Sequence, residues 1–159
     1  MNILMDNPAQ VGSDLIADAV GAIREYKPPM IIFDMGTATT VCVVDRKKNY
    51  IGGMILPGVR TSLDALTARA AQLSGIDLEA PKRVIGKNTN ECMKSGIVYS
   101  NAALIDGVIL RMEEELGEKA TVIATGGLAK SIVPYCKEDV ILDDDLLLKG
   151  LLWVYKKNS

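Results

Sequence analysis

The segment that most constrains the fold of this chain is the run at 31–40, Ile-Ile-Phe-Asp-Met-Gly-Thr-Ala-Thr-Thr. Its first three residues are apolar and follow a Pro-Pro pair, which is typical of a buried strand. Asp34 comes where this strand should end, and Gly36 and Thr37 follow it. Because glycine lets the backbone turn close to a ligand and threonine hydroxyls can hydrogen-bond phosphate oxygens, the run predicts a ligand-binding turn after the strand. An ordinary turn without a ligand is the alternative.

Two more apolar runs follow, at 41–44 and 51–56, with the polar segment 45–49 between them. Together with the first run they predict three antiparallel strands joined by turns. A fourth strand is predicted at 120–125 and a last short one at 140–142. Because a run of strands gives way to alternating helices and strands, the sequence predicts an α/β domain whose mixed sheet has helices on both faces.

Apolar residues recur at helical spacing in several segments. The first is 13–26, where the side chain of Ser13 or Asp14 is suited to cap the unpaired amides of the first turn. Asp14 also has a functional interpretation, as a carboxylate at the entrance of a cleft, and the two roles are compatible. The same spacing predicts helices at 59–73, 91–116 and 144–155, with Thr89 as a candidate cap of the long helix.

A Gly126-Gly127 pair follows the predicted strand at 120–125. Two glycines between a buried strand and a helix let the backbone pass flat against a planar ligand, and the helix behind them directs its positive amide end toward that ligand. The pair lacks the GxGxxG spacing and so does not support a Rossmann site. It indicates a candidate turn for binding a planar ligand.

Composition narrows the chemistry. The net charge of −2 gives no reason to expect nucleic acid or an anionic membrane as a partner, and no apolar run is long enough to span a membrane. The chain has no histidine, so acid–base catalysis falls to a carboxylate, a lysine or a cysteine. We expect no signal peptide. The cysteines have no CxxC spacing, which disfavours a zinc site or disulfides and favours free thiols in the cytoplasm; they are Cys42, Cys92 and Cys136.

A series of short motifs carries a family resemblance. They are Asp6-Asn7-Pro8, Val11-Gly12-Ser13-Asp14, Asp34-Met35-Gly36-Thr37-Ala38-Thr39-Thr40, Gly52-Gly53 with Pro57-Gly58, Gly86-Lys87-Asn88-Thr89, Ser95-Gly96 and Thr125-Gly126-Gly127. With them the chain resembles the C-terminal part of a type III pantothenate kinase, in the sugar kinase, actin and heat-shock chaperone superfamily. The resemblance implies a ribonuclease H-like (actin-like ATPase) domain. It implies a single domain over 1–159, in which the helix at 13–26 leads into a core at 30–155, and no N-terminal phosphate-loop domain.

The family transfers the terminal phosphate of ATP to pantothenate, the first step of coenzyme A biosynthesis. The resemblance therefore implies ATP with Mg²⁺ and a monovalent cation, K⁺ or NH₄⁺. Asp14 matches the proton-accepting aspartate of the family, Asp34 its cation ligand and Thr37 an ATP contact, while Gly126 and Gly127 match the region near the adenosine. A carboxylate that orients the attacking hydroxyl and accepts its proton suits phosphoryl transfer, which depends on alignment and charge stabilisation.

The resemblance also implies an acceptor site and an assembly. The positions that match the pantothenate-binding region are Gly12, Ser13, Asp14, Leu15 and Thr89. The family forms homodimers with this site close to the subunit interface. The predicted helix at 91–116 is therefore the candidate dimer surface.

Three features depart from the family pattern. Leu15 stands where the family usually has an arginine that can grip the pantothenate carboxylate, and Met5 stands where it often has a substrate-contacting tyrosine. The missing first domain leaves half of the nucleotide cleft, so we expect the chain to be inactive alone and active only with a separate N-terminal half. The alternatives are a non-catalytic binding or regulatory paralogue that keeps the fold and the dimer surface, and a sugar kinase or phosphohydrolase of the same superfamily.

Overall fold

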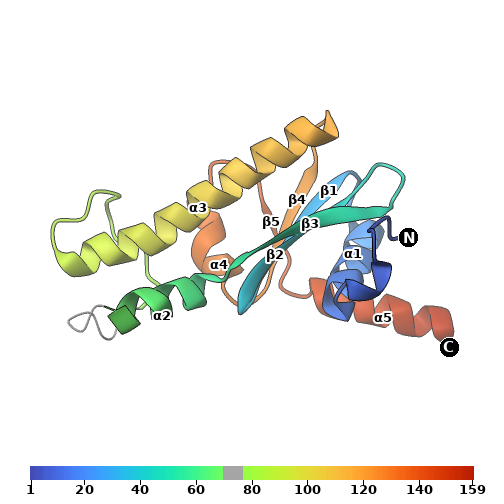
Figure 1. Cartoon of the computed structure of the whole chain (residues 1–159), viewed down its shortest axis with the longest axis horizontal. Coiled ribbons are helices and arrows are strands. Elements are labelled where there is room, and N and C mark those ends of the chain that lie inside the picture. The colour runs from blue at the N-terminus through green and yellow to red at the C-terminus, as the bar shows by residue number, and fades with distance from the viewer. Residues whose placement is uncertain (70–76) are drawn as a thin grey trace.

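The computed structural model describes residues 1–69 and 77–159 and contains a five-stranded mixed sheet (Figure 1). The order across the sheet is β3-β2-β1-β4-β5; β2 is antiparallel to its two neighbours, whereas β4 and β5 run parallel to β1. The strands are β1 (Met30–Met35), β2 (Ala38–Val44), β3 (Tyr50–Pro57), β4 (Thr121–Thr125) and β5 (Ile141–Leu142). This order with these directions is that of a ribonuclease H-like domain, so the predicted fold is confirmed.

Helices cover both faces of the sheet, as predicted (Figure 1). The long helix α3 packs with α2 and α4 on one face, and α1 packs with α5 on the other. Their bounds are α1 (Ser13–Glu25), α2 (Val59–Arg69), α3 (Thr89–Leu116), α4 (Ala129–Ile132) and α5 (Leu146–Asn158), with short 3₁₀ turns at Pro8–Gln10 and Val133–Tyr135. Among the helices within these ranges, none has the length and apolar character needed to cross a membrane.

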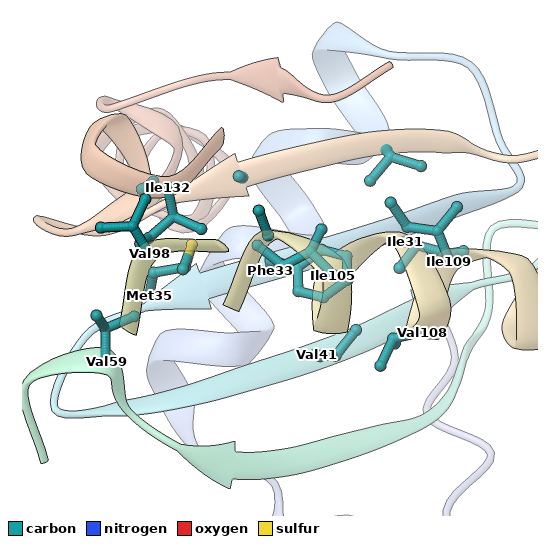
Figure 2. Close-up of a cluster of buried hydrophobic side chains, with 14 of the residues drawn as sticks. Ile31, Phe33, Met35, Val41, Val59, Val98, Ile105, Val108, Ile109 and Ile132 are labelled. Carbon is teal, nitrogen blue, oxygen red and sulfur yellow. The ribbon is translucent and has the colours of Figure 1, made fainter. Parts of the chain in front are cut away.

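The larger core lies between β1 and α3. Ile31, Phe33 and Met35 alternate along β1 and point toward α3, where Ile105 and Ile109 pack against them (Figure 2). All five side chains are at most 1% exposed, and burying each one stabilises the fold by about 1.5–3 kcal/mol. This face of β1 is therefore fully used by packing.

The second core lies between the opposite face of β1 and helix α1. Met30 and Ile32 belong to this face and pack with Ala19 and Ala22 of α1. Because successive side chains of a strand point to opposite faces, Asp34 also lies on the α1 side. Because of this alternation, the Asp34 carboxylate lies at the end of β1, beneath α1.

Helices α1 and α5 cross in close backbone contact. A Cβ atom on Gly21 would lie 2.6 Å from the carbonyl oxygen of Leu146, and a Cβ atom on Gly150 would overlap the carbonyl group of Ala17. Both positions therefore need glycine for the helices to approach this closely.

A buried polar cluster ties the same two helices together. Tyr26 donates a hydrogen bond to Asp143 at 2.7 Å, and the Lys149 ammonium lies 2.7 and 2.9 Å from the two oxygens of that carboxylate. Burial by itself would raise the pKa of Asp143, but the hydrogen bonds from Lys149 and Tyr26 hold it below its usual range. The start of α5 is thereby fixed to the end of α1.

The start of α1 differs from the prediction. Gly12, rather than Ser13 or Asp14, occupies the cap position, and it makes no side-chain cap hydrogen bond. The Asp14 carboxylate instead accepts a hydrogen bond from the amide of Leu15 at 2.9 Å, within the first turn. Neither Ser13 nor Asp14 is therefore the N-cap, although Asp14 does accept from a first-turn amide as predicted, and the helix ends at 25 rather than 26.

The long helix begins earlier than predicted because its cap is a different residue. The side-chain oxygen of Asn88 accepts a hydrogen bond from the amide of Glu91 at 2.9 Å, so α3 starts at Thr89 rather than at 91. Asparagine ranks above threonine as an N-cap, which explains why Thr89 lies inside the helix. The residues from 84 to 88 form bends and no strand.

Other helices and strands also begin or end at residues different from those predicted. The helix expected behind the Gly126-Gly127 pair has only four residues, because Pro134 follows and cannot continue it, so it supplies little dipole. Helix α5 begins at 146 rather than 144, because Asp143 accepts from the amide of Asp145 and holds a turn there. Strands β4 and β5 each start one residue later than predicted. The predicted helix at 59–73 is confirmed as far as 69, and 70–73 lie outside the described residues.

Candidate active site

Asp34 lies at the junction of β1 and the turn after β4. Its Oδ1 atom is so near Gly126 that a Cβ atom there would come within 2.6 Å of it. Gly126 has φ of 91°, a conformation that glycine adopts without strain. Burial raises the pKa of Asp34, and the neighbouring charge of Asp14 raises it further. The structure thus brings together two of the predicted site residues, Asp34 and Gly126, with Asp14 within electrostatic reach.

A third carboxylate, Asp18, lies beneath these two and was missed from the sequence. It is only 1% exposed, and burial raises its pKa to about 7, with smaller contributions from Asp34, Asp14 and Asp143. Within the ranges that the structure describes, its Oδ1 atom has no hydrogen-bond partner. Asp18 stands four residues after Asp14 on one helix, so the pair shares a helix face; that spacing was the signal available in the sequence.

Thr40 adds an oxygen to the same place. It pairs with Asp34 across β1 and β2, so both side chains lie on the α1 side of the sheet. The Thr40 hydroxyl is also buried and, as far as the described residues go, unpartnered. Asp18 and Thr40 therefore leave two buried oxygens near Asp34 unsatisfied, which is costly unless a ligand, water or ion supplies the partner.

The predicted nucleotide residues Thr37 and Gly127 come together at one cavity. Its volume is about 490 Å³, and its lining includes Thr37 from the β1–β2 turn and Gly127 from the turn after β4. Arg60, in the first turn of α2, lines the same cavity. Among the residues that the structure describes, the ion pair of Arg60 is with Asp64 at 3.8 Å, between two side chains that are both more than half exposed. Such a pair is weak, so the guanidinium remains free to contact an anion.

Helix α2 is fastened to this turn by backbone contact. The Thr61 hydroxyl donates to the carbonyl oxygen of Thr37 at 2.9 Å, and Gly58 packs so tightly that a Cβ atom would overlap that carbonyl. These contacts hold the amino-terminal turn of α2, with Arg60, beside Thr37. Arg60 was missed from the sequence because its position beside the cavity depends on this packing of α2.

The two residues that differ from the family pattern, Leu15 and Met5, lie at a second cavity. Leu15 and Met5 both line a space of about 170 Å³, together with Gly12, Tyr50 and Ile55. Ser13 and Asp14 are exposed beside it. The positions near α1 that were predicted to bind the acceptor therefore adjoin a mainly apolar pocket.

Thr89 is far from the other positions that the resemblance assigns to acceptor binding. It is exposed in the first turn of α3, and that end of α3 lies at the opposite end of the molecule from α1 (Figure 1). A cavity of about 590 Å³ opens beside the same turn, lined in part by Lys82, Arg83, Lys87 and Lys94. One chain alone therefore does not bring Thr89 together with Gly12.

The remaining reactive groups do not form a competing site. Burial raises the pKa of the Cys42 thiol above its usual range and that of Cys136 to about 12, so neither is a thiolate at neutral pH. Across 1–69 and 77–159, no group of three or more Asp, Glu, Cys or His side chains is arranged to hold a metal ion. Carboxylates, hydroxyls and the Arg60 guanidinium are therefore the polar groups of the candidate site.

Sequence comparison connects the chain to one family. The family model for type III pantothenate kinase matches residues 1–111. A type III pantothenate kinase from Exiguobacterium sp. is 48% identical over 159 residues, and one from Bacillus cytotoxicus is 45% identical over 159 residues. Each match covers the whole of this chain but only 62% and 61% of the relative, so the chain spans about three fifths of their length.

Comparison of structures supports the fold. A Campylobacter jejuni protein described as a conserved Baf family transcriptional activator has a TM-score of 0.64 at 21% identity, covering 98% of this chain and 69% of that one. The ethanolamine utilization protein EutJ from Carboxydothermus hydrogenoformans has a TM-score of 0.52 at 14% identity, covering 86% and 50%. At these identities the likeness concerns the fold alone.

Proposed function

This chain belongs to the type III pantothenate kinase family, and from that premise we propose that it supplies one half of an ATP-dependent pantothenate kinase. The reaction would be the first step of coenzyme A biosynthesis, in the cytoplasm. The observation that carries the proposal is the shared cavity of Thr37 and Gly127, which adjoins the Asp34–Gly126 contact. Residues from two separate turns thus converge where the family resemblance expects ATP.

In this proposal ATP, with Mg²⁺ on its phosphates, binds along Thr37, Gly126 and Gly127. The cavity is bordered by Arg60 and by the amino-terminal turn of α2. Both are suited to phosphate, because a guanidinium makes charge-assisted hydrogen bonds and unpaired amides favour an anion. We therefore add Arg60 to the proposed ATP-binding residues.

Asp34 is the proposed ligand of a monovalent cation, K⁺ or NH₄⁺. The unsatisfied oxygens of Asp18 and Thr40 fit such an ion, since K⁺ takes oxygen ligands and needs less negative charge than a divalent metal. A cation here would offset phosphate charge, and it would relieve the repulsion among Asp14, Asp18 and Asp34.

Asp14 is the proposed proton acceptor from the pantothenate hydroxyl. It is exposed, and its Oδ1 atom accepts from the Leu15 amide, which leaves Oδ2 to meet a substrate. Gly12, Ser13 and Leu15 would line the pantothenate site with it. Leu15 removes the expected arginine, and the lost charge-assisted contact would cost roughly 1.5–3 kcal/mol of pantothenate affinity.

The distant position of Thr89 supports a homodimer. If Thr89 contacts pantothenate, it would do so in the site of a second copy, because the end of α3 that carries it lies far from α1 within one chain (Figure 1). The proposed dimer surface is α3, whose first turn carries Thr89. Each active site would then draw on both subunits.

In this proposal residues 1–159 form a C-terminal-type domain, and activity also requires the phosphate-loop domain that closes the cleft in the superfamily. Closure excludes water and completes phosphate positioning, so the chain alone should bind ATP but should not transfer phosphate.

The first test is calorimetric titration of the chain with Mg-ATP, with and without K⁺. The proposal expects binding that K⁺ strengthens. Phosphorylation is then measured after co-expression with the part of the Exiguobacterium relative that has no counterpart here. A pair that forms but never phosphorylates pantothenate would contradict the kinase and favour the non-catalytic paralogue.

Asp14→Asn separates chemistry from folding. It should abolish phosphorylation by the pair while leaving ATP binding intact and changing stability by less than about 1 kcal/mol, the usual effect of one charge in a first helical turn. Asp139→Asn, at another exposed aspartate, is the matched control and should keep full activity. Equal activity of the two variants would remove Asp14 from the mechanism.

A further inference from the structure

We infer that the cavity at the start of α3, here called the α3 cavity, binds a small polar molecule that carries a phosphate group. Its volume of about 590 Å³ lies within the range of small-molecule sites, about 300–1,000 Å³. It opens at the opposite end of the molecule from α1 (Figure 1). The inference is independent of the proposed kinase function, because the lining of the α3 cavity includes no residue assigned above to ATP, the cation or pantothenate.

Four cationic side chains line the α3 cavity. They come from the loop before α3 and from the second turn of the helix, and they are Lys82, Arg83, Lys87 and Lys94. Two carboxylates, those of Glu79 and Glu91, line the cavity as well. The cations exceed the carboxylates by two charges, which is close to the charge of one phosphate group at neutral pH, about −1.5 to −2.

In the part of the chain that the structure describes, these four cations form no ion pairs. Every ion pair found there involves other side chains. The remaining residues, 70–76, include no aspartate or glutamate. Cations held close together repel one another, so binding an anion among them is favourable.

The two carboxylates of the lining leave these cations available. Glu91 accepts a hydrogen bond from the backbone amide of Lys87 at 2.8 Å, and its own amide donates to the Asn88 side chain at 2.9 Å. The Glu91 side chain therefore holds the backbone of the loop rather than a neighbouring ammonium group. Glu79 is exposed, so water and salt screen its charge.

Hydrogen bonds from α3 hold the loop in place. The Tyr99 hydroxyl donates to the carbonyl oxygen of Pro81 at 3.2 Å, and the Ser95 hydroxyl donates to that of Val84. These two contacts flank the cations at 82 and 83 in the sequence. The backbone that carries the cations is therefore fixed before a ligand arrives, which reduces the ordering that binding requires.

The rest of the lining favours a polar ligand. Its apolar side chains are the small ones of Ala80 and Pro81, and the amides of Asn88 and Asn90 can hydrogen-bond hydroxyl groups. Lysine and arginine make charge-assisted hydrogen bonds with phosphate oxygens. Because no aromatic residue is among the described residues of this lining, the bases of a single-stranded nucleic acid would find no stacking platform there. A phosphorylated small molecule, such as a sugar phosphate, therefore fits better than a nucleic acid.

Calorimetric titration of the full chain with ribose 5-phosphate, and with ribose as the uncharged counterpart, tests the inference. Lys82→Gln with Lys94→Gln removes two charges from the α3 cavity. Lys47→Gln with Lys137→Gln is the matched control, at two exposed lysines elsewhere on the surface. Arg60→Ala removes the cation of the proposed ATP cavity. Circular dichroism checks that every variant is folded.

The inference expects binding of ribose 5-phosphate but not of ribose. The affinity should fall about tenfold or more in the Lys82 and Lys94 double variant and should be unchanged in the control and in Arg60→Ala. The inference is overturned if ribose 5-phosphate does not bind, if the control weakens binding equally, or if Arg60→Ala abolishes binding. Displacement of ribose 5-phosphate by pantothenate, or tighter binding of a single-stranded oligonucleotide through the same two lysines, would also overturn it.

Binding of Mg-ATP is measured in the same variants and scored separately. A chain that binds ribose 5-phosphate through Lys82 and Lys94 but does not bind Mg-ATP would refute the proposed function and leave the α3 site in place. The reverse result would leave the proposed function in place and refute the α3 site.

Discussion

Substituting the paired glycines after β4 one at a time should separate a structural glycine from a functional one. Gly126 has φ of 91°, and a Cβ atom there would lie 2.6 Å from Asp34 Oδ1 and 2.7 Å from the backbone nitrogen and carbonyl carbon of Met35. Gly127 has no atom within 4 Å of a Cβ position and does not need a positive φ. We expect Gly126→Ala to destabilise the chain and Gly127→Ala to leave it folded.

The expected cost follows from two contributions. Holding alanine in a left-handed conformation costs about 1–2 kcal/mol. Forcing a methyl group against backbone atoms that cannot move away costs about 1–3 kcal/mol more. The total of about 3 kcal/mol corresponds to a fall in melting temperature of roughly 6–12 °C for a chain of this size. Gly127→Ala should change the free energy of unfolding by less than about 0.5 kcal/mol.

Urea denaturation followed by circular dichroism gives both free energies, and titration with Mg-ATP gives the functional result. Because Gly127 lines the proposed nucleotide cavity, its methyl group should weaken ATP binding although the fold is unchanged. Equal stability of Gly126→Ala and the parent would refute the packing argument. Unchanged ATP affinity in Gly127→Ala would remove that turn from the nucleotide site.

Three further substitutions test single interactions. Arg60→Ala should weaken ATP binding by about tenfold or more, the value of a charge-assisted contact of roughly 1.5–3 kcal/mol, whereas Arg111→Ala on α3 should not; titration calorimetry checks both. Burial raises the pKa of Asp18 to about 7, so the native state keeps a proton that the unfolded state loses, and stability should fall as pH rises from about 4 to about 7. Asp18→Asn should remove that fall, so its gain in urea unfolding should be larger at about pH 8 than at about pH 5. Tyr26→Phe removes a donor to Asp143 and should cost about 1–3 kcal/mol at neutral pH; because the pKa of Asp143 is lowered, this cost should shrink in acid as the carboxylate is protonated, as thermal melts at several pH values would reveal.

The parts of the fold that follow from periodic burial were predictable. The apolar run at 31–33 is a central strand, and its alternation also decides that Asp34 faces α1. The ends of helices and strands were harder to predict from the sequence, because they depend on competition among neighbouring polar groups. Asn88 outcompetes Thr89 as a cap, and hydrogen bonds at Asp143 delay the start of α5.

The candidate site divides in the same way. Thr37 and Gly127 were predicted as ATP contacts from short motifs, and both line one cavity. Arg60 gains its position only when α2 packs on the Thr37 turn, so no local pattern identifies it. Asp18 is a carboxylate on a buried helix face, against the hydrophobic pattern, and its place beneath Asp34 depends on how α1 crosses the sheet.

The close contact of α1 and α5 at their glycines makes the two helices move together. With no side chain between their backbones at Gly21 and Gly150, neither helix can tilt without moving the other. A molecule bound to α5 and one bound at the candidate site beside Asp14 would therefore act on the same pair of helices. If binding at one of these places tightens binding at the other by some factor, thermodynamic reciprocity requires the same factor in the opposite direction.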